Sequence, residues 1–251
     1  MPAVPLKGIR VHYETRGEGP ALVMLHGALA SHRAWIGQVP VFARSRRVVT
    51  PDLRGHGKTT RFGVAGNPWE RWNVGLFTDD LLAFVDRVSR DDPVELVGAS
   101  LGGIVAAWAA ARRPDRVKSL VLVSTPPGPQ ERFERWFSRH TPDTLPEPDR
   151  RLMALWHGEP YWKDLARHGL AYFAKSRPEV FAPAEDLAAY KGPALVLQGR
   201  HDDLLEPGSL DEWQRLLPQA KTETVDGDHA FFADGRAGTR AMNQLLGAFL
   251  A

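Results

Sequence analysis

Ser100 stands in the pattern Gly98-Ala99-Ser100-Leu101-Gly102. The apolar run 93–97 precedes this pattern and a helix-like run, 103–109, follows it, so the sequence predicts a strand, a sharp turn and a helix. Glycines two residues on either side let strand and helix approach, and such a turn holds the hydroxyl clear of the sheet. We predict that Ser100 is a catalytic nucleophile; an ordinary Gly/Ser turn is the alternative.

A serine hydroxyl is a weak nucleophile at neutral pH, so it needs a base to take its proton and an acid to orient that base. In this arrangement the acid and the histidine follow the serine in that order, each after a later strand. His229 follows the last predicted strand, and we predict that it is the general base. Asp202 and Asp203 both follow the strand predicted at 194–198; the spacing Gly199-x-x-Asp202 favours Asp202 without excluding its neighbour.

Attack on a carbonyl creates an oxyanion, which backbone N–H groups can stabilise. The residue after the nucleophile, Leu101, supplies one such group. His26-Gly27-Ala28 ends an earlier apolar run, and a glycine there lets the backbone approach the site, so we predict that the N–H of Ala28 is the second donor. His26 itself is expected to be buried and bonded to the backbone.

Strand-like and helix-like patterns alternate along the chain, which is typical of a mostly parallel sheet with helices on both faces. The predicted strands are 9–13, 21–25, 47–50, 94–97, 117–123, 194–198 and 222–225, and the predicted helices are 79–88, 101–112, 208–217 and 238–250.

The segment 126–190 shows no clear strand, and its aromatic residues recur at helical intervals. We interpret it as a helical cap inserted between two strands. Trp136, Trp156 and Trp162 belong to this segment and are the predicted substrate-binding residues, although a packing role in the core is the alternative for each. Aromatic and aliphatic walls would favour an apolar substrate group.

The composition limits the remaining classes of function. The 251 residues include 32 basic and 30 acidic side chains, a formal net charge of +2, so nucleic acid is not an expected partner. The absence of cysteine excludes disulfides and thiolate chemistry. The sequence shows neither a signal peptide nor an apolar run long enough to span a membrane, and we expect no membrane partner and a cytoplasmic location.

Taken together, five motifs resemble the α/β-hydrolase superfamily. They are His26-Gly27, the run 52–57 (Asp-Leu-Arg-Gly-His-Gly), Gly98-x-Ser100-x-Gly102-Gly103, Gly199-x-x-Asp202 and His229. The resemblance implies an α/β fold with an eight-stranded, mostly parallel sheet whose second strand is antiparallel, flanked by helices, with a helical cap over the site. The implied divisions are 1–125 and 191–251 for the hydrolase core and 126–190 for the cap, and the run 52–57 shapes a loop.

The chain looks like small carboxylesterases, 3-oxoadipate enol-lactonases, non-heme haloperoxidases and C–C bond hydrolases of this superfamily. Ser100 stands where haloalkane dehalogenases and epoxide hydrolases carry aspartate, which argues against both. Pro207 comes one residue later after Asp202 than the spacing usual in this superfamily. Asp203 therefore stays an alternative for the acid.

These observations favour a serine hydrolase that cleaves carboxylic esters or lactones with an apolar part through an acyl-enzyme. The alternatives are C–C bond hydrolysis of vinylogous diketo acids and a ligand-binding protein on a hydrolase scaffold. We expect neither a cofactor nor a metal, since no His-x-x-x-His spacing is present and the serine mechanism needs no Lewis acid. The sequence does not predict the oligomeric state.

Overall fold

The computed structural model describes residues 2–175, 177–182 and 184–251. These residues form one sheet of eight strands, in the order β1-β2-β4-β3-β5-β6-β7-β8. The strands are β1 (Ala3–Leu6), β2 (Ile9–Arg16), β3 (Ala21–Leu25), β4 (Arg47–Pro51), β5 (Val94–Ala99), β6 (Val117–Val123), β7 (Ala194–Gly199) and β8 (Ala220–Val225). Only β2 is antiparallel to both of its neighbours, and β3 to β8 are parallel. The predicted fold class is therefore confirmed.

The central strands are buried on both faces. Every residue of β3, β5 and β7 is buried, which explains why these strands show continuous apolar runs instead of an alternating pattern. All seven strands predicted from such runs are present. The eighth, β1, lies at the edge of the sheet and is only partly buried. Its four residues include a proline and are too few to show a strand pattern.

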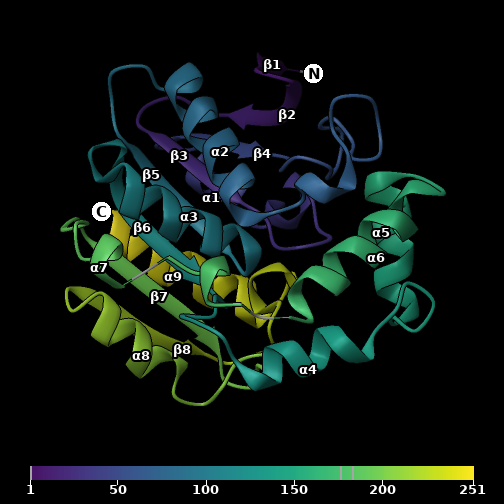
Figure 1. Ribbon diagram of the computed structural model, residues 1–251. Coiled ribbons are helices and arrows are strands. Elements are labelled where there is room, and N and C mark those ends of the chain that lie inside the picture. Colours follow the sequence, from purple (N-terminus) through teal and green to yellow (C-terminus); the bar gives the residue numbers. More distant parts are fainter. Residues whose placement is uncertain (1, 176, 183) are drawn as a thin grey trace.

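Helices cover both faces of the sheet (Figure 1). One core cluster joins α2 (Val74–Val88), α3 (Leu101–Arg112), α7 (Ala184–Leu187) and α8 (Ser209–Leu216) to the first face. The other joins α1 (Val39–Phe42) and α9 (Ala237–Leu250) to the opposite face. Helix α2 begins five residues before its predicted start, because the Asn73 side chain accepts the amide of Leu76 at 2.8 Å and caps the helix there. Among the described residues, no helix is both long and apolar enough to cross a bilayer.

Three helices between β6 and β7 form a separate group at one side of the sheet (Figure 1). These are α4 (Glu131–Arg139), α5 (Glu147–His157) and α6 (Tyr161–Phe173). Phe133 and Phe137 of α4 pack on Phe173 of α6, with ring centroids 5.5 and 5.1 Å from it. The helical spacing of aromatic residues in this segment thus builds a small core between α4 and α6. After α6 the chain returns to the sheet, where α7 packs against α3.

The sheet brings distant parts of the sequence to one edge. Because β3, β5, β7 and β8 all run in one direction, the loops that follow them open at the same side of the sheet. The predicted site residues lie in these loops: Ala28 after β3, Ser100 after β5, Asp202 after β7 and His229 after β8.

Candidate active site

Ser100 occupies a strained turn between β5 and α3. Its backbone has φ 50° and ψ −116°, a conformation that costs a residue with a side chain about 1–3 kcal/mol. The turn is held because the Ser100 amide donates to Val123 O at 2.9 Å and its carbonyl accepts the amide of Ile104 at 3.0 Å. This is the sharp turn between strand and helix that the sequence predicts for Ser100.

The flanking glycines are required by close packing. A Cβ on Gly98 would lie 2.3 Å from the carbonyl oxygen of Gly102, and a Cβ on Gly102 would lie 2.4 Å from that of Leu25. Neither position has room for a side chain. The pattern around Ser100 therefore reflects the approach of α3 to β3 and β5.

Asp202 and His229 are in contact. Nδ1 of His229 lies 3.0 and 2.9 Å from Oδ1 and Oδ2 of Asp202. Oδ1 also accepts the amides of Leu204 and Leu205 at 3.0 and 3.3 Å. The Asp202 side chain is fully buried, and that of His229 is 20% exposed. A carboxylate can only accept, so Nδ1 carries a proton and the neutral ring has its lone pair on Nε2, as a general base requires.

The favoured acid, Asp202, and its open alternative, Asp203, have different environments. Asp202 is buried against His229, whereas the neighbouring Asp203 is exposed. Beside the histidine, Asp228 turns its carboxylate toward the backbone, accepting the amide of Ala230 at 2.8 Å. Geometry therefore favours Asp202 as the acid.

The loop after β3 runs beside the nucleophile. A Cβ on Gly27 would lie 3.3 Å from Cβ of Ser100, so the next amide, that of Ala28, belongs to a peptide adjacent to the site. Leu101 is the first residue of α3, where N–H groups have no acceptor within the helix and the helix dipole favours an anion. These are the two predicted oxyanion donors.

His26 orients the peptide that carries the Ala28 N–H, one of the two predicted donors. Its Nε2 accepts the amide of Leu53 at 3.0 Å and its Nδ1 donates to the carbonyl of Gly27 at 2.8 Å. That carbonyl and the Ala28 N–H lie in one planar trans peptide and point in opposite directions. By fixing one, His26 fixes the direction of the other, in agreement with the structural role expected for it.

Burial keeps His26 neutral. Loss of solvation lowers its pKa from 6.5 to about 4, although nearby Asp52 opposes this shift. The pKa of His56 is lowered well below its ordinary value for the same reason. A neutral ring is what each hydrogen-bonding pattern needs, since one nitrogen must accept.

We expect the free energy of unfolding to fall as the pH falls from 6.5 toward 4. In this window the unfolded chain protonates its histidine at position 26, whereas the folded protein does not, so protons favour the unfolded state. From its pKa of about 4, His26 alone should account for about 2 kcal/mol between pH 7 and pH 5. Urea unfolding at the two pH values measures this, with His26→Gln as the control that removes the titration. Equal losses in both proteins would contradict the assignment.

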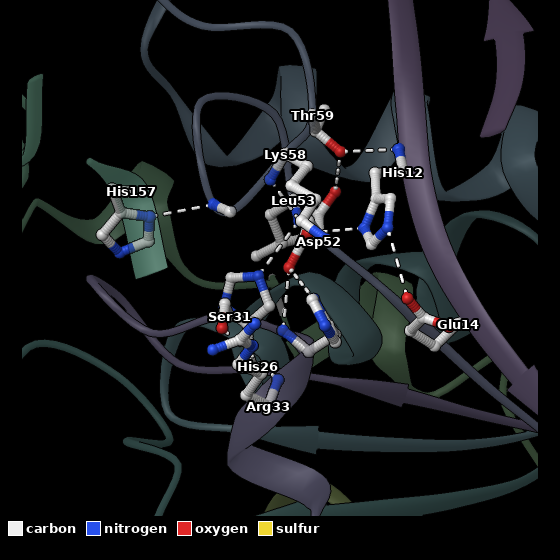
Figure 2. Close-up of polar contacts among 12 residues, drawn as sticks. His12, Glu14, His26, Ser31, Arg33, Asp52, Leu53, Lys58, Thr59 and His157 are labelled. Atoms are coloured by element: carbon white, nitrogen blue, oxygen red, sulfur yellow. Dashed lines mark hydrogen bonds and ion pairs between the residues drawn. The ribbon is translucent and has the colours of Figure 1, made fainter. Parts of the chain in front are cut away.

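Asp52 is the centre of a buried hydrogen-bond network (Figure 2). The sequence suggested that the run 52–57 shapes a loop but did not indicate the partners of Asp52. One carboxylate oxygen binds the Nδ1 and the amide of His32 at 2.9 and 2.8 Å. The other binds the Nδ1 of His12 at 2.8 Å and the amide of Lys58 at 3.0 Å. Burial alone would raise the pKa of Asp52, but the bonds from His32 and the nearby histidines lower it below its usual range. Asp52 thus ties the loops after β3 and β4 together, which agrees with the loop-shaping role expected for the run 52–57.

His12, in β2, is one of the two histidines whose side chains bind Asp52. Its side chain is 6% exposed and faces Asp52 on the inner side of β2, with Nε2 3.5 Å from Glu14 (Figure 2). The carboxylate that binds this histidine lies 40 positions away in the chain, so no local sequence pattern indicates the contact.

His12, His32 and Asp52 are also the group of described residues whose ligand atoms come close enough, within 4.8 Å, to hold a metal ion. The carboxylate offers about four acceptor positions, and four donors occupy them. A metal would have to displace the two histidine bonds. The donor set therefore fits a hydrogen-bonded junction better than a metal site.

The three tryptophans predicted to bind substrate have different environments. Trp162 is buried and its indole N–H donates to Glu159, as in a packed residue. Trp136 is half-buried with its ring centroid 4.3 Å from that of His140, and half-buried Trp156 lies edge-on to His157. Their contact with substrate stays a prediction.

The fold and the geometry of the site agree with a family comparison. Residues 20–174 match the family described as the alpha/beta hydrolase fold. The chain belongs to this family, as its motifs suggested.

Particular relatives are similar over different lengths. The chain is 27% identical over 240 residues to the pimeloyl-[acyl-carrier protein] methyl ester esterase of Nitrosomonas europaea, covering 84% of this chain and 88% of that protein. It is 35% identical over 121 residues to the probable oxidoreductase EphD of Mycobacterium tuberculosis, a match that spans 47% of this chain but only 20% of that relative. The solved meta-cleavage product hydrolase of Pseudomonas fluorescens shares the fold, with TM-score 0.82 and 18% identity over 100% of this chain and 97% of that one.

Proposed function

We propose that this protein is a serine hydrolase that cleaves carboxylic esters or lactones through an acyl-enzyme. The observation that carries the proposal is the Asp202–His229 bond at the edge of the sheet where Ser100 occupies its strained turn. The similarity to an ester-cleaving relative over 84% of the chain supports the same reaction type.

In the proposed mechanism His229 accepts the proton of Ser100 as the serine oxygen attacks the carbonyl carbon. The amides of Ala28 and Leu101 donate to the oxyanion that forms, and the buried Asp202 stabilises the imidazolium. His229 then gives its proton to the leaving alcohol. Water, activated by His229, attacks the acyl-enzyme in the second half and releases the acid together with free Ser100.

Helices α4–α6 are proposed to cap this site. His157 at the end of α5 bonds to Leu29 O and the Gly57 amide, in the loops after β3 and β4, and the amide of Arg132 in α4 donates to Glu206 in the loop after β7. These contacts join the helices to loops at the carboxyl edge of the sheet. In this arrangement the aromatic residues of the proposed cap, including Trp136 and Trp156, would lie at the edge of the sheet where an apolar substrate group would be bound.

A panel of p-nitrophenyl esters from acetate to palmitate, together with lactones and a vinylogous diketo acid, tests this function. For a cleft of bounded size, each added methylene should raise kcat/KM by a few-fold, up to about 0.8 kcal/mol, until the cleft is full, after which the rate should fall. We expect the maximum at short to medium chains. A maximum at palmitate would indicate a lipase, and cleavage of the diketo acid alone would indicate a C–C bond hydrolase. No cleavage of any compound would indicate a binding protein.

A further inference from the structure

His157 is the last residue of α5, and both of its ring nitrogens contact loops of the core. Nδ1 accepts the amide of Gly57 at 2.9 Å, and this contact is drawn in Figure 2. Because an amide can only donate, the proton of the neutral ring sits on Nε2, which donates to the carbonyl of Leu29 at 2.9 Å. His157 as a whole residue is only 2% exposed, so neither bond competes with bulk water.

Leu29 is held from both sides by histidines. Its amide donates to Nε2 of His56 at 3.3 Å, and its carbonyl accepts from His157. Its backbone has φ 62°, a left-handed conformation that costs a residue such as leucine about 1–3 kcal/mol and persists only where surrounding bonds impose it. The contact from α5 is therefore one of the constraints that keep this loop in its strained form.

The constrained residue is next to the proposed oxyanion donor. The turn from Gly27 to Ala30 closes with the amide of Ala30 donating to Gly27 O at 3.3 Å. Ala28 lies within that turn, so a rotation of the Leu29 peptide would be transmitted to the Ala28 N–H. Donors in an oxyanion hole act only when aimed at the developing charge, and a displacement of about 1 Å can cost about 100-fold in rate.

We propose that His157 is a positioning residue that keeps the Ala28 N–H directed at the oxyanion. Docking of α5 against the core therefore completes the oxyanion hole. This proposal rests on the proposed function. It means that the helices over the site do more than enclose substrate, because α5 fixes the Leu29 carbonyl directly. Burial, which lowers the pKa of His157, supports the neutral ring that these bonds require.

The chain offers a matched control for loss of contact between these helices and the core. The Tyr161 hydroxyl of α6 also makes two such bonds, donating to Gly55 O at 2.9 Å and accepting the amide of Phe62 at 3.1 Å. Tyr161→Phe removes both bonds without touching Leu29. If His157 had a purely structural role, variants of His157 and Tyr161 would lose kcat and melting temperature in parallel.

We expect His157→Leu to lower kcat for a p-nitrophenyl ester by about 10- to 100-fold, with KM within about 3-fold of wild type. Binding of a trifluoromethyl ketone, whose adduct oxygen occupies the oxyanion hole, should weaken by a similar factor. His157→Gln, which can accept from Gly57 and donate to Leu29, should recover most of the loss. Tyr161→Phe should change kcat less than about 3-fold. An unchanged kcat in His157→Leu would overturn the proposal. So would losses of kcat in His157→Leu and Tyr161→Phe that are both proportional to the fall in melting temperature.

Amide hydrogen exchange of the segment 25–31 separates this proposal from the proposed function. Exchange should be faster in His157→Leu than in wild type and Tyr161→Phe, whether or not an ester is cleaved. Unaltered exchange in His157→Leu would overturn the role of His157 by itself. A wild-type protein that cleaves no ester would instead overturn the proposed function, while the exchange rates still decide whether α5 holds the loop. Faster exchange with unchanged kcat would overturn the link to the oxyanion hole.

Discussion

Ser100→Ala is expected to lower kcat/KM for ester hydrolysis by about four to six orders of magnitude. Removing the hydroxyl removes the bond-forming atom, and only the residual rate from oxyanion donors and binding remains. Ser100 is 8% exposed and its turn is held by backbone bonds, so the variant should fold with a similar melting temperature. Initial rates with the best ester of the panel, at equal protein concentration, measure the effect.

His229→Ala tests the general base that acts together with Ser100. Its loss should approach that of Ser100→Ala, and the double variant should be little worse than either single one, because base and nucleophile act together. Near wild-type turnover in purified Ser100→Ala, or additive losses in the double variant, would contradict the mechanism.

Asp202→Asn is expected to lower kcat by about three to four orders of magnitude with a small change in KM. The native carboxylate accepts the Nδ1 proton of His229 at 2.9 Å. An asparagine can turn its NH₂ group toward the ring, which would favour the tautomer with its lone pair on Nδ1 and leave Nε2 unable to accept the serine proton. Steady-state kinetics on the ester measure the loss.

Asp203→Asn is the control for this prediction. The neighbouring side chain is exposed, so its replacement should change kcat by less than about 2-fold. A larger loss in Asp203→Asn than in Asp202→Asn would move the role of the acid to Asp203.

Sequence reasoning succeeded where the signal is local. The pattern around Ser100 predicted its strained turn, because the nearby glycines report the close approach of strand and helix. Buried strands such as β3 and β7 were predicted to within a residue or so, since burial on both faces leaves a continuous apolar run. The edge strand β1 was not assigned to particular residues, although the resemblance implied an eighth strand, because four residues that include a proline are too few to show a strand pattern.

The sequence could not predict the contacts that connect distant loops. His157 lies 128 positions from the Leu29 carbonyl that it binds, and no spacing rule links a helix end to a loop so far away. His12 and His32 meet at Asp52 only because β2 and β4 pair in the sheet and the loop after β3 lies against them. Such contacts depend on tertiary packing, and the choice between Asp202 and Asp203 was open for the same reason.

Reaction with a fluorophosphonate, followed by mass spectrometry of the digested protein, tests whether Ser100 is an activated nucleophile. The serine oxygen displaces fluoride from phosphorus, so we expect one covalent adduct, on the peptide that contains Ser100. The adduct should be absent in Ser100→Ala and form far more slowly in His229→Ala. A folded wild-type protein that gains no adduct at Ser100, or an adduct that persists in Ser100→Ala, would show that Ser100 is not the activated nucleophile.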